Sequence, residues 1–309
     1  TENQLFSLDD EIDNLKEARE EYFQSWGENK QTAKDNFINT QKALAVRILN
    51  DKNFDKETHD AGTKLANWNP FVYESSPWFD NEWMFGIENG FDIVIGNPPW
   101  NKFKPLDQEF FSYYCDNYTE LSKEKQKSEK NKLLKNIEIA ESYKKYLDKF
   151  KLQSKYYRNS YELQGTGDLN LYKLFLEKSY FLADGIVSLL IPGQITIDDG
   201  CRTFRKRFIK DESLKILIGL INRKKLFEYV HLEQRFVVIV LDKINNYDSV
   251  LTYGWSYYFN NFHNELLTKI DHNFFKEFDS NLTFYLSNNP IDYKTYDNIK
   301  KNKIVISLF

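Results

Sequence analysis

The sequence has few of the residues on which disulfide and metal chemistry depend. Its 309 residues include only two cysteines, Cys115 and Cys201, too few for a disulfide framework or a cysteine-based zinc site. The four histidines lie far apart, without the spacing of metal ligands (His59, His231, His263 and His272). We therefore expect no metal site in this chain.

Long apolar runs are also missing. The longest, residues 186–191 and 236–241, are far shorter than the roughly 20 residues that a membrane-spanning helix needs. The N-terminus has no charged, apolar and cleavable signal pattern. We therefore expect a soluble protein of the cytoplasm with no membrane partner. Methionine occurs only at Met84 and the first residue is Thr1, which favours a segment of a longer polypeptide.

Neither sign of charge dominates. The 42 Lys and Arg residues face 46 Asp and Glu residues, so the net charge of −4 gives the whole chain no general attraction to nucleic acid. Local basic clusters can still provide one. Apolar residues make up 41% and aromatic residues 17% of the chain, which excludes a disordered polypeptide.

The spacing of apolar residues divides the chain into three parts. Residues 8–24 and 31–50 repeat apolar side chains at helical spacing, so we expect a helical segment over 1–66. Residues 67–245 alternate short apolar runs with helical patterns, which predicts an α/β sheet. Residues 246–309 have only weak periodicity and form a C-terminal segment. The expected elements of the middle part are strands at 91–95, 186–191, 214–220 and 236–241 and helices at 169–182 and 202–210.

A polar insertion at residues 121–158 interrupts the α/β pattern. Its basic residues outnumber its acidic ones. One interpretation is a solvated helix or helical hairpin, because Lys-rich helix faces are common on protein surfaces. The other is contact with nucleic-acid phosphates. The sequence leaves both open.

The most informative stretch is the strand at 91–95 with the Gly96-Asn97-Pro98-Pro99-Trp100 turn that follows it. Open α/β sheets bind ligands at the carboxyl ends of their strands. Two prolines make the turn rigid and contribute no N–H groups, so the Pro98 carbonyl and the Asn97 amide oxygen are fixed acceptors. Trp100 adds a flat aromatic surface. These parts suit the task of holding a planar base by its exocyclic amine.

Two acceptors on the hydrogens of an aromatic amine favour the form with a free lone pair, so positioning replaces acid–base catalysis. The stretch resembles the catalytic signature (Asp/Asn/Ser)-Pro-Pro-aromatic of DNA amino-methyltransferases. The form in which it follows Phe91-Asp92-Ile93-Val94-Ile95 is similar to adenine-N6 methyltransferases of the γ order, as in large type IIG restriction-modification polypeptides and phage-defence relatives. The other stretches that carry the resemblance are residues 78–87, 167–178, 185–192, 225–228 and 236–241, within roughly 68–243.

The resemblance implies a Rossmann-like methyltransferase that uses S-adenosylmethionine. In that family a Gly-rich loop after the first strand and an acidic residue ending the next strand bind the cofactor, and neither precedes Asn97 here. Gly165-Thr166-Gly167 follows no apolar strand and predicts a loop. We therefore expect the catalytic half of a methyltransferase domain. Its parent would supply the N-terminal cofactor-binding part and a target-recognition domain beyond 246–309.

The same resemblance makes Phe227 the second aromatic that stacks on the base. A basic cluster nearby is a candidate for DNA-backbone contacts, although a solvated face explains it equally well. Its proposed members are Arg202, Arg205, Arg207, Arg223, Lys224 and Lys225.

The function that follows is base-flipping transfer of a methyl group to adenine N6 in double-stranded DNA, as part of a restriction-modification or phage-defence polypeptide. The chain alone is expected to be inactive. Two alternatives stay open. One is a DNA-binding or structural fragment without activity, and the other is methylation of RNA or of protein glutamine by the same kind of site.

Overall fold

The computed structural model describes residues 9–69, 71, 81, 85–258 and 267–301. These residues form two compact units, one within residues 1–89 and the other within 90–309. Most of the 78–87 stretch on which the resemblance draws lies outside the described residues. Each unit is described by itself.

The first unit is helical, as the sequence predicts. Its helices are α2 (Asp9–Gln24), α3 (Glu28–Asn50) and α4 (Lys56–Asn67), of which α4 was not predicted. Leu15, Phe37 and Leu44 belong to the apolar cluster that joins the helices. Asp55 begins α4 as its N-cap and accepts a hydrogen bond from the Thr58 N–H at 2.8 Å.

The second unit contains a six-stranded mixed sheet in the order β1-β2-β4-β3-β5-β6. β1 pairs with β2, and β3 with β5, in parallel; the other three pairs are antiparallel. The first four strands in chain order confirm the predicted ones, whereas β5 and β6 were not predicted. The strands are β1 (Phe91–Gly96), β2 (Ala183–Pro192), β3 (Leu214–Ile221), β4 (Arg235–Asp242), β5 (Ser249–Ser256) and β6 (Thr268–Asp271).

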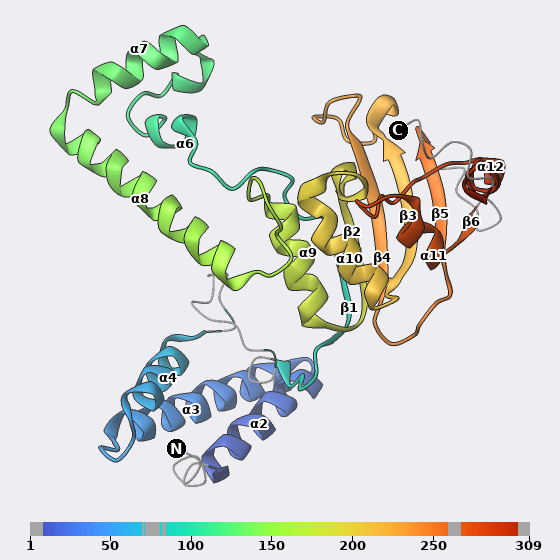
Figure 1. Cartoon of the computed structure of the whole chain (residues 1–309). Helices are drawn as coiled ribbons and strands as arrows, with labels where there is room; N and C mark the ends of the chain where they lie inside the picture. Colours follow the sequence, from blue (N-terminus) through green and yellow to red (C-terminus); the bar gives the residue numbers. More distant parts are fainter. Residues whose placement is uncertain (1–8, 70, 72–80, 82–84, 259–266, 302–309) are drawn as a thin grey trace. The chain divides into compact units, whose positions relative to one another are not determined.

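One face of the sheet carries the main core. The alternation of β2 turns Val187, Leu189 and Ile191 to this face, where α9 and α10 pack against them (Figure 1). Both helices lie where the sequence predicts them. Helices of the second unit outside the insertion are α9 (Leu171–Leu182), α10 (Arg202–Lys210), α11 (His272–Phe278) and α12 (Pro290–Lys301). The expected α/β class with N-terminal helices and a Lys-rich helical insertion is confirmed.

The opposite face of the sheet is less covered, and β1 is the clearest case. Register pairs Ile93 with Ile186 and Ile95 with Ser188, so these side chains share that face. Ile93 is 62% and Ile95 78% exposed. A continuous apolar run such as residues 91–95 predicts a buried strand, and the exposure of Ile93 and Ile95 shows that this prediction is wrong for the described residues. β1 lies at the edge of the described sheet, and its second edge pairs with none of the described strands.

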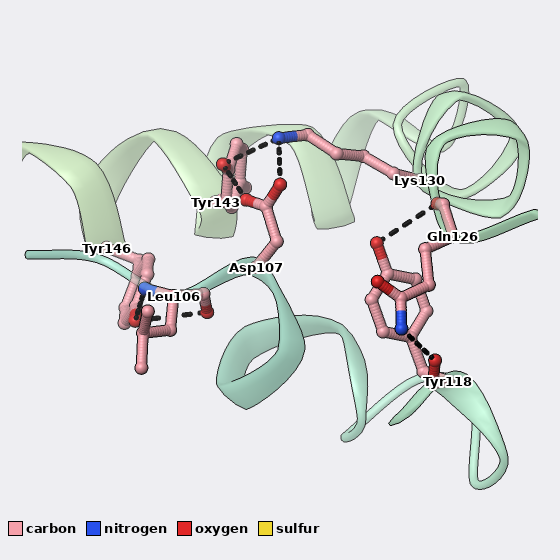
Figure 2. A network of polar contacts seen from close by, with 7 residues as sticks. All are labelled: Leu106, Asp107, Tyr118, Gln126, Lys130, Tyr143 and Tyr146. Atoms are coloured by element: carbon pink, nitrogen blue, oxygen red, sulfur yellow. Dashed lines mark hydrogen bonds and ion pairs between the residues drawn. The ribbon is translucent and has the colours of Figure 1, made fainter. Parts of the chain in front are cut away.

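The predicted insertion is a helical hairpin. Its helices are α7 (Lys123–Leu133) and α8 (Ile137–Ser160), and the short α6 (Asp107–Phe111) lies beside them. Figure 2 shows the polar network that joins the three: Lys130 donates to Asp107 at 2.7 Å and to the Tyr143 hydroxyl at 2.9 Å. Burial raises the pKa of Asp107, but hydrogen bonds from Lys130 and Tyr143 outweigh it and hold that pKa below its ordinary value.

The expected three-part division of the chain differs from the observed units. The boundary between the two units lies after Asn89 in the sequence, whereas the expected boundary was at residue 66. The sheet also continues past residue 245, because β5 pairs with β3 and β6 with β5. Within the described ranges, no helix has the length and apolar character needed to cross a membrane.

Candidate active site

The Asn97-Pro98-Pro99-Trp100 turn begins where β1 ends, at the carboxyl end of a strand that pairs in parallel with β2. Pro98 is buried, whereas Asn97 is exposed. The Asn97 side chain makes no hydrogen bond to any other described residue, so its amide is free to accept from a substrate. This is the presentation that the sequence predicts, and the catalytic role itself stays a prediction.

Trp100 is half-buried and held in one orientation. Its indole Nε1 donates to the Leu190 carbonyl oxygen at 3.3 Å. Its ring lies 5.9 Å from Phe227 at 75° and 5.7 Å from Phe236 at 31°, measured between centroids. The structure therefore brings the two predicted stacking residues into contact. Because they meet edge to face, no base fits between them without movement of one ring.

Asn222 holds the turn that carries Phe227, and the sequence did not single it out. Its side chain is fully buried. It donates to the Phe227 and Val230 carbonyls at 2.9 and 2.7 Å, and it accepts from the Phe227 N–H at 2.9 Å. Lys225 supports the turn with a left-handed backbone, φ 52°. A polar residue directly after an apolar strand was the available signal, the same signal that identified Asn97.

The chain after Trp100 pairs with the segment before α9. The Phe103 N–H donates to the Leu169 carbonyl at 2.8 Å, and the Leu171 N–H donates to the Asn101 carbonyl at 2.9 Å. Residues 104–168, including the hairpin, therefore leave and re-enter the fold at one place beside the Trp100 turn.

A pocket of about 590 Å³ opens beside Trp100. It is polar, with amide, carboxylate and ammonium groups in its wall, and the Gly165–Gly167 stretch that the sequence predicts as a loop contributes to it. The lining residues are Trp100, Lys102, Thr166, Gly167, Asp168, Asn170, Tyr172, Lys173, Pro192, Gln194, Asp198, Asp199, Gly200 and Gln234.

Two lysines of this pocket have different roles. Lys102 forms an ion pair with Asp168 at 2.6 Å on the exposed rim, which raises the pKa of Lys102 and lowers that of Asp168. Lys173 is 3% exposed and donates to the carbonyls of Gln164 and Gly200, both at 2.9 Å. Lys173 thereby joins the loop at residues 162–168 to the loop at residues 198–200, and both loops contribute to the pocket wall.

Glu177 on α9 fixes the start of the loop that precedes α9, at residues 162–164. Its buried carboxylate accepts hydrogen bonds from the Leu163 N–H at 3.0 Å, from the Gln164 side chain at 3.0 Å and from the Glu162 N–H. A carboxylate that satisfies several donors in a buried site is a strong local anchor. The pocket wall is therefore preorganised.

The proposed DNA-backbone residues on α10 turn out to differ from one another. Arg205 is fully buried and donates to the carbonyls of Ile195 at 3.0 Å, Asp198 at 2.9 Å and Asn281. Arg205 has no exposed surface for a phosphate, so its prediction as a DNA-backbone contact is wrong. Charge alone cannot reveal that a helix residue faces inward. Arg202 is exposed.

The remaining members are surface residues with partial pairing. Arg207 forms an ion pair with Asp211. Arg223 binds the Glu233 carboxylate through two hydrogen bonds of 2.8 and 3.1 Å. Lys224 and Lys225 are exposed without a carboxylate partner among the described residues.

A place for S-adenosylmethionine is not found in the part of the chain that the structure describes. No described strand there leads into a Gly-rich loop and a helix N-terminus, the arrangement that binds nucleotide-like cofactors. Likewise, no group of three or more His, Cys, Asp or Glu among the described residues could hold a metal ion.

The chain matches the model of the Eco57I restriction-modification methylase family over residues 4–227 and belongs to that family. The prediction of a restriction-modification methyltransferase is thus confirmed at that level. The match also includes helices α2, α3 and α4, where the sequence suggested no motif. No curated protein sequence matches the chain.

Parts of three solved structures are similar to this chain. They are a type I restriction-modification system methyltransferase subunit from Streptococcus thermophilus (15% identity, TM-score 0.31), a DrdV–DNA complex (13%, 0.32) and the ATP-dependent type ISP restriction-modification enzyme LlaBIII bound to DNA (10%, 0.27). They cover 56%, 58% and 58% of this chain, which spans 28%, 17% and 12% of theirs.

Proposed function

We propose that the chain is the substrate-binding half of a methyltransferase that acts on N6 of adenine in double-stranded DNA, within a type IIG-like restriction-modification polypeptide of the cytoplasm. The observation that carries this proposal is the Asn97-Pro98 turn. It presents a free amide oxygen at the carboxyl end of β1, with Trp100 and the polar pocket directly after it.

In this mechanism Asn97 Oδ1 and the Pro98 carbonyl oxygen accept the two hydrogens of the amine. Both acceptors are fixed by the prolines, so they need no reorganisation when the nitrogen becomes positively charged. The nitrogen lone pair would form the new N–C bond as the methyl–sulfur bond of the donor breaks and S-adenosylhomocysteine leaves, and the methylated amine would then release one proton to water. S-adenosylmethionine supplies the methyl group, and residues outside this chain would bind it.

The open edge of β1 is where such residues would join. Ile93 and Ile95 present an apolar surface that burial would stabilise by roughly 1.5–3 kcal/mol for each side chain. A further strand in parallel with β1 would cover the backbone edge, and its connection would cover the isoleucines. We propose that the cofactor-binding part of the parent protein does both.

Trp100 is the stacking surface in this proposal, because it lines the pocket. Extrusion of a nucleotide from the duplex costs a few kcal/mol, and stacking in the pocket returns part of it. Phe227 meets Trp100 edge to face and acts as a brace in the observed arrangement. For Phe227 to cover the opposite face of the base, its turn would have to move away from Trp100.

The direct experiment is product identification. The whole parent protein is incubated with duplex DNA and S-adenosylmethionine, and the digested nucleosides are analysed by mass spectrometry. The proposal predicts N6-methyladenine. A product methylated on cytosine contradicts the adenine assignment. Methylation of RNA or of protein glutamine, with DNA unchanged, supports the alternative substrates, and no methylation at all supports a DNA-binding or structural fragment.

A further inference from the structure

One face of α8 carries a line of basic side chains. Lys144, Lys151, Lys155 and Arg158 follow one another at steps of seven, four and three residues, and such steps return to the same side of a helix. All four are exposed. We call them the α8 stripe. At a rise of about 1.5 Å per residue, the stripe is roughly 21 Å long.

One acid, the exposed Asp148, lies on this line between Lys144 and Lys151, so the four cations of the α8 stripe are only partly neutralised by the protein. The helix has no Asp or Glu after Asp148. The three lysines of the stripe have no hydrogen bond or ion pair with any other described residue, in contrast to Lys130 on α7, which is bound to Asp107. A solvated surface helix usually alternates its charges, whereas here four cations share a line with one acid and the last three follow one another without an acid between them, which is a binding feature for anions.

An adjacent side of α8 fixes the helix to the chain that follows the Asn97–Trp100 turn, because Tyr143, Phe150 and Tyr157 each directly precede a residue of the stripe. The Phe103 ring lies 5.0 Å from both Phe150 and Tyr157, and the Phe110 ring lies 5.0 Å from Tyr143. Phe103 comes only three residues after Trp100. The direction of the α8 stripe is therefore set by the same segment that forms the candidate active site.

The stripe ends at the pocket. Arg158 donates to the carbonyl oxygen of Gly167, which lines the pocket, at 2.9 Å. Lys102 lowers the pKa of Asp168 most, and Lys104 and Arg158 lower it further, so three cations surround one acid at this rim. The positive surface therefore runs outward along α8 from the place where a flipped base would enter.

We propose that the α8 stripe binds the phosphates of duplex DNA next to the nucleotide that enters the pocket. This rests on the proposed function for the identity of the nucleic acid. A length of roughly 21 Å corresponds to about six base pairs of rise, enough for each cation to reach a separate phosphate of one strand. The hairpin thus acts as an arm that positions the strand.

The test is the salt dependence of DNA affinity, measured by fluorescence anisotropy with the 309-residue chain and a labelled duplex. The test variant combines Lys144→Gln, Lys151→Gln and Lys155→Gln. Its matched control combines Lys123→Gln, Lys125→Gln and Lys127→Gln on α7, which removes the same charge from exposed lysines of the same hairpin. Circular dichroism and thermal unfolding check that both variants are folded.

Each phosphate contact contributes about 0.9 to the slope of log K against log salt, so loss of three contacts should reduce the slope by about 2.7. We expect this for the α8 variant, with at least tenfold weaker binding at 0.1 M salt, and little change for the α7 variant. Equal losses in both variants, no loss in either, or no DNA binding by the unmodified chain would overturn the proposal.

Two further outcomes separate this proposal from the proposed function. A loss that affects single-stranded RNA but not duplex DNA would reject DNA as the partner of the stripe. If the slope changes as expected while the parent protein yields no N6-methyladenine, the stripe stands as a DNA contact and the methylation assignment fails.

Discussion

Replacement of Trp100 separates its packing role from its proposed role in holding the base. Trp100→Ala removes the ring contacts with Phe227 and Phe236 and the 3.3 Å hydrogen bond to Leu190. Aromatic-to-alanine changes in full cores cost about 3–5 kcal/mol, so for this half-buried ring we expect about 2 kcal/mol of unfolding free energy. Trp100→Phe retains a ring and loses the hydrogen bond, which costs about 1 kcal/mol.

The two variants should differ more strongly in how well they capture the flipped base. Stacking contributes about 1–3 kcal/mol, so Trp100→Ala in the parent protein should weaken capture of the flipped base by roughly 5- to 150-fold, while Trp100→Phe should stay close to the original. 2-Aminopurine fluorescence at the target position reports extrusion, and methylation kinetics run in parallel. If the alanine and phenylalanine variants behave alike at temperatures where both are folded, Trp100 packs the fold and does not hold the base.

Three other measurements test separate parts of the structure. Arg205→Leu should lower the free energy of unfolding by about 3–5 kcal/mol because it leaves buried carbonyls unsatisfied. Arg202→Leu on the same helix is the control and should change that free energy by less than about 1 kcal/mol. Equal effects of the two changes in chemical denaturation would contradict the buried role of Arg205. Burial raises the pKa of Asp242, but hydrogen bonds from Tyr247, Lys215 and Asn245 outweigh it and hold the pKa below the ordinary 3.8. Its stabilising effect is therefore full above that value and lost as the pH falls below it, so the stability difference from Asp242→Asn should be larger at about pH 7 than at about pH 2, and an unchanged difference would refute the assignment. Titration calorimetry of the isolated chain with S-adenosylmethionine should give no micromolar binding, and such binding would place the cofactor site within these residues.

Much of the sheet could be predicted because its strands are short apolar runs between helical patterns. β5 was missed because five of its eight residues are only partly buried and because aromatic residues on the partly buried face, such as Tyr253 and Trp255, hide the apolar–polar alternation in the sequence. The edge position of β1 was also missed. Phe91–Gly96 has the composition of a strand covered on both faces, and composition cannot reveal which neighbours are present.

The candidate site was predictable where a rigid local motif specifies it. The exposed Asn97 follows from two prolines after a strand, whereas the burial of Pro98 was not predicted. Trp100 and Phe227 lie on distant segments, and only the family resemblance associated them, as two faces around a base and not as rings in edge-to-face contact. The roles of Arg205 and Lys173 depend on carbonyl groups contributed by loops, and no pattern of side chains in the sequence identifies such partners.

The central claim is that Asn97 accepts from the amine that is methylated. The most direct measurement compares tritiated-methyl incorporation by the parent protein and its Asn97→Ala variant on the same duplex, with Asn131→Ala on the exposed surface of α7 as the control. Loss of one preorganised polar contact costs on the order of 3 kcal/mol, so Asn97→Ala should be at least about a hundredfold slower with unchanged thermal unfolding. The control should retain full activity. Near-normal methylation by a folded Asn97→Ala variant would contradict the account.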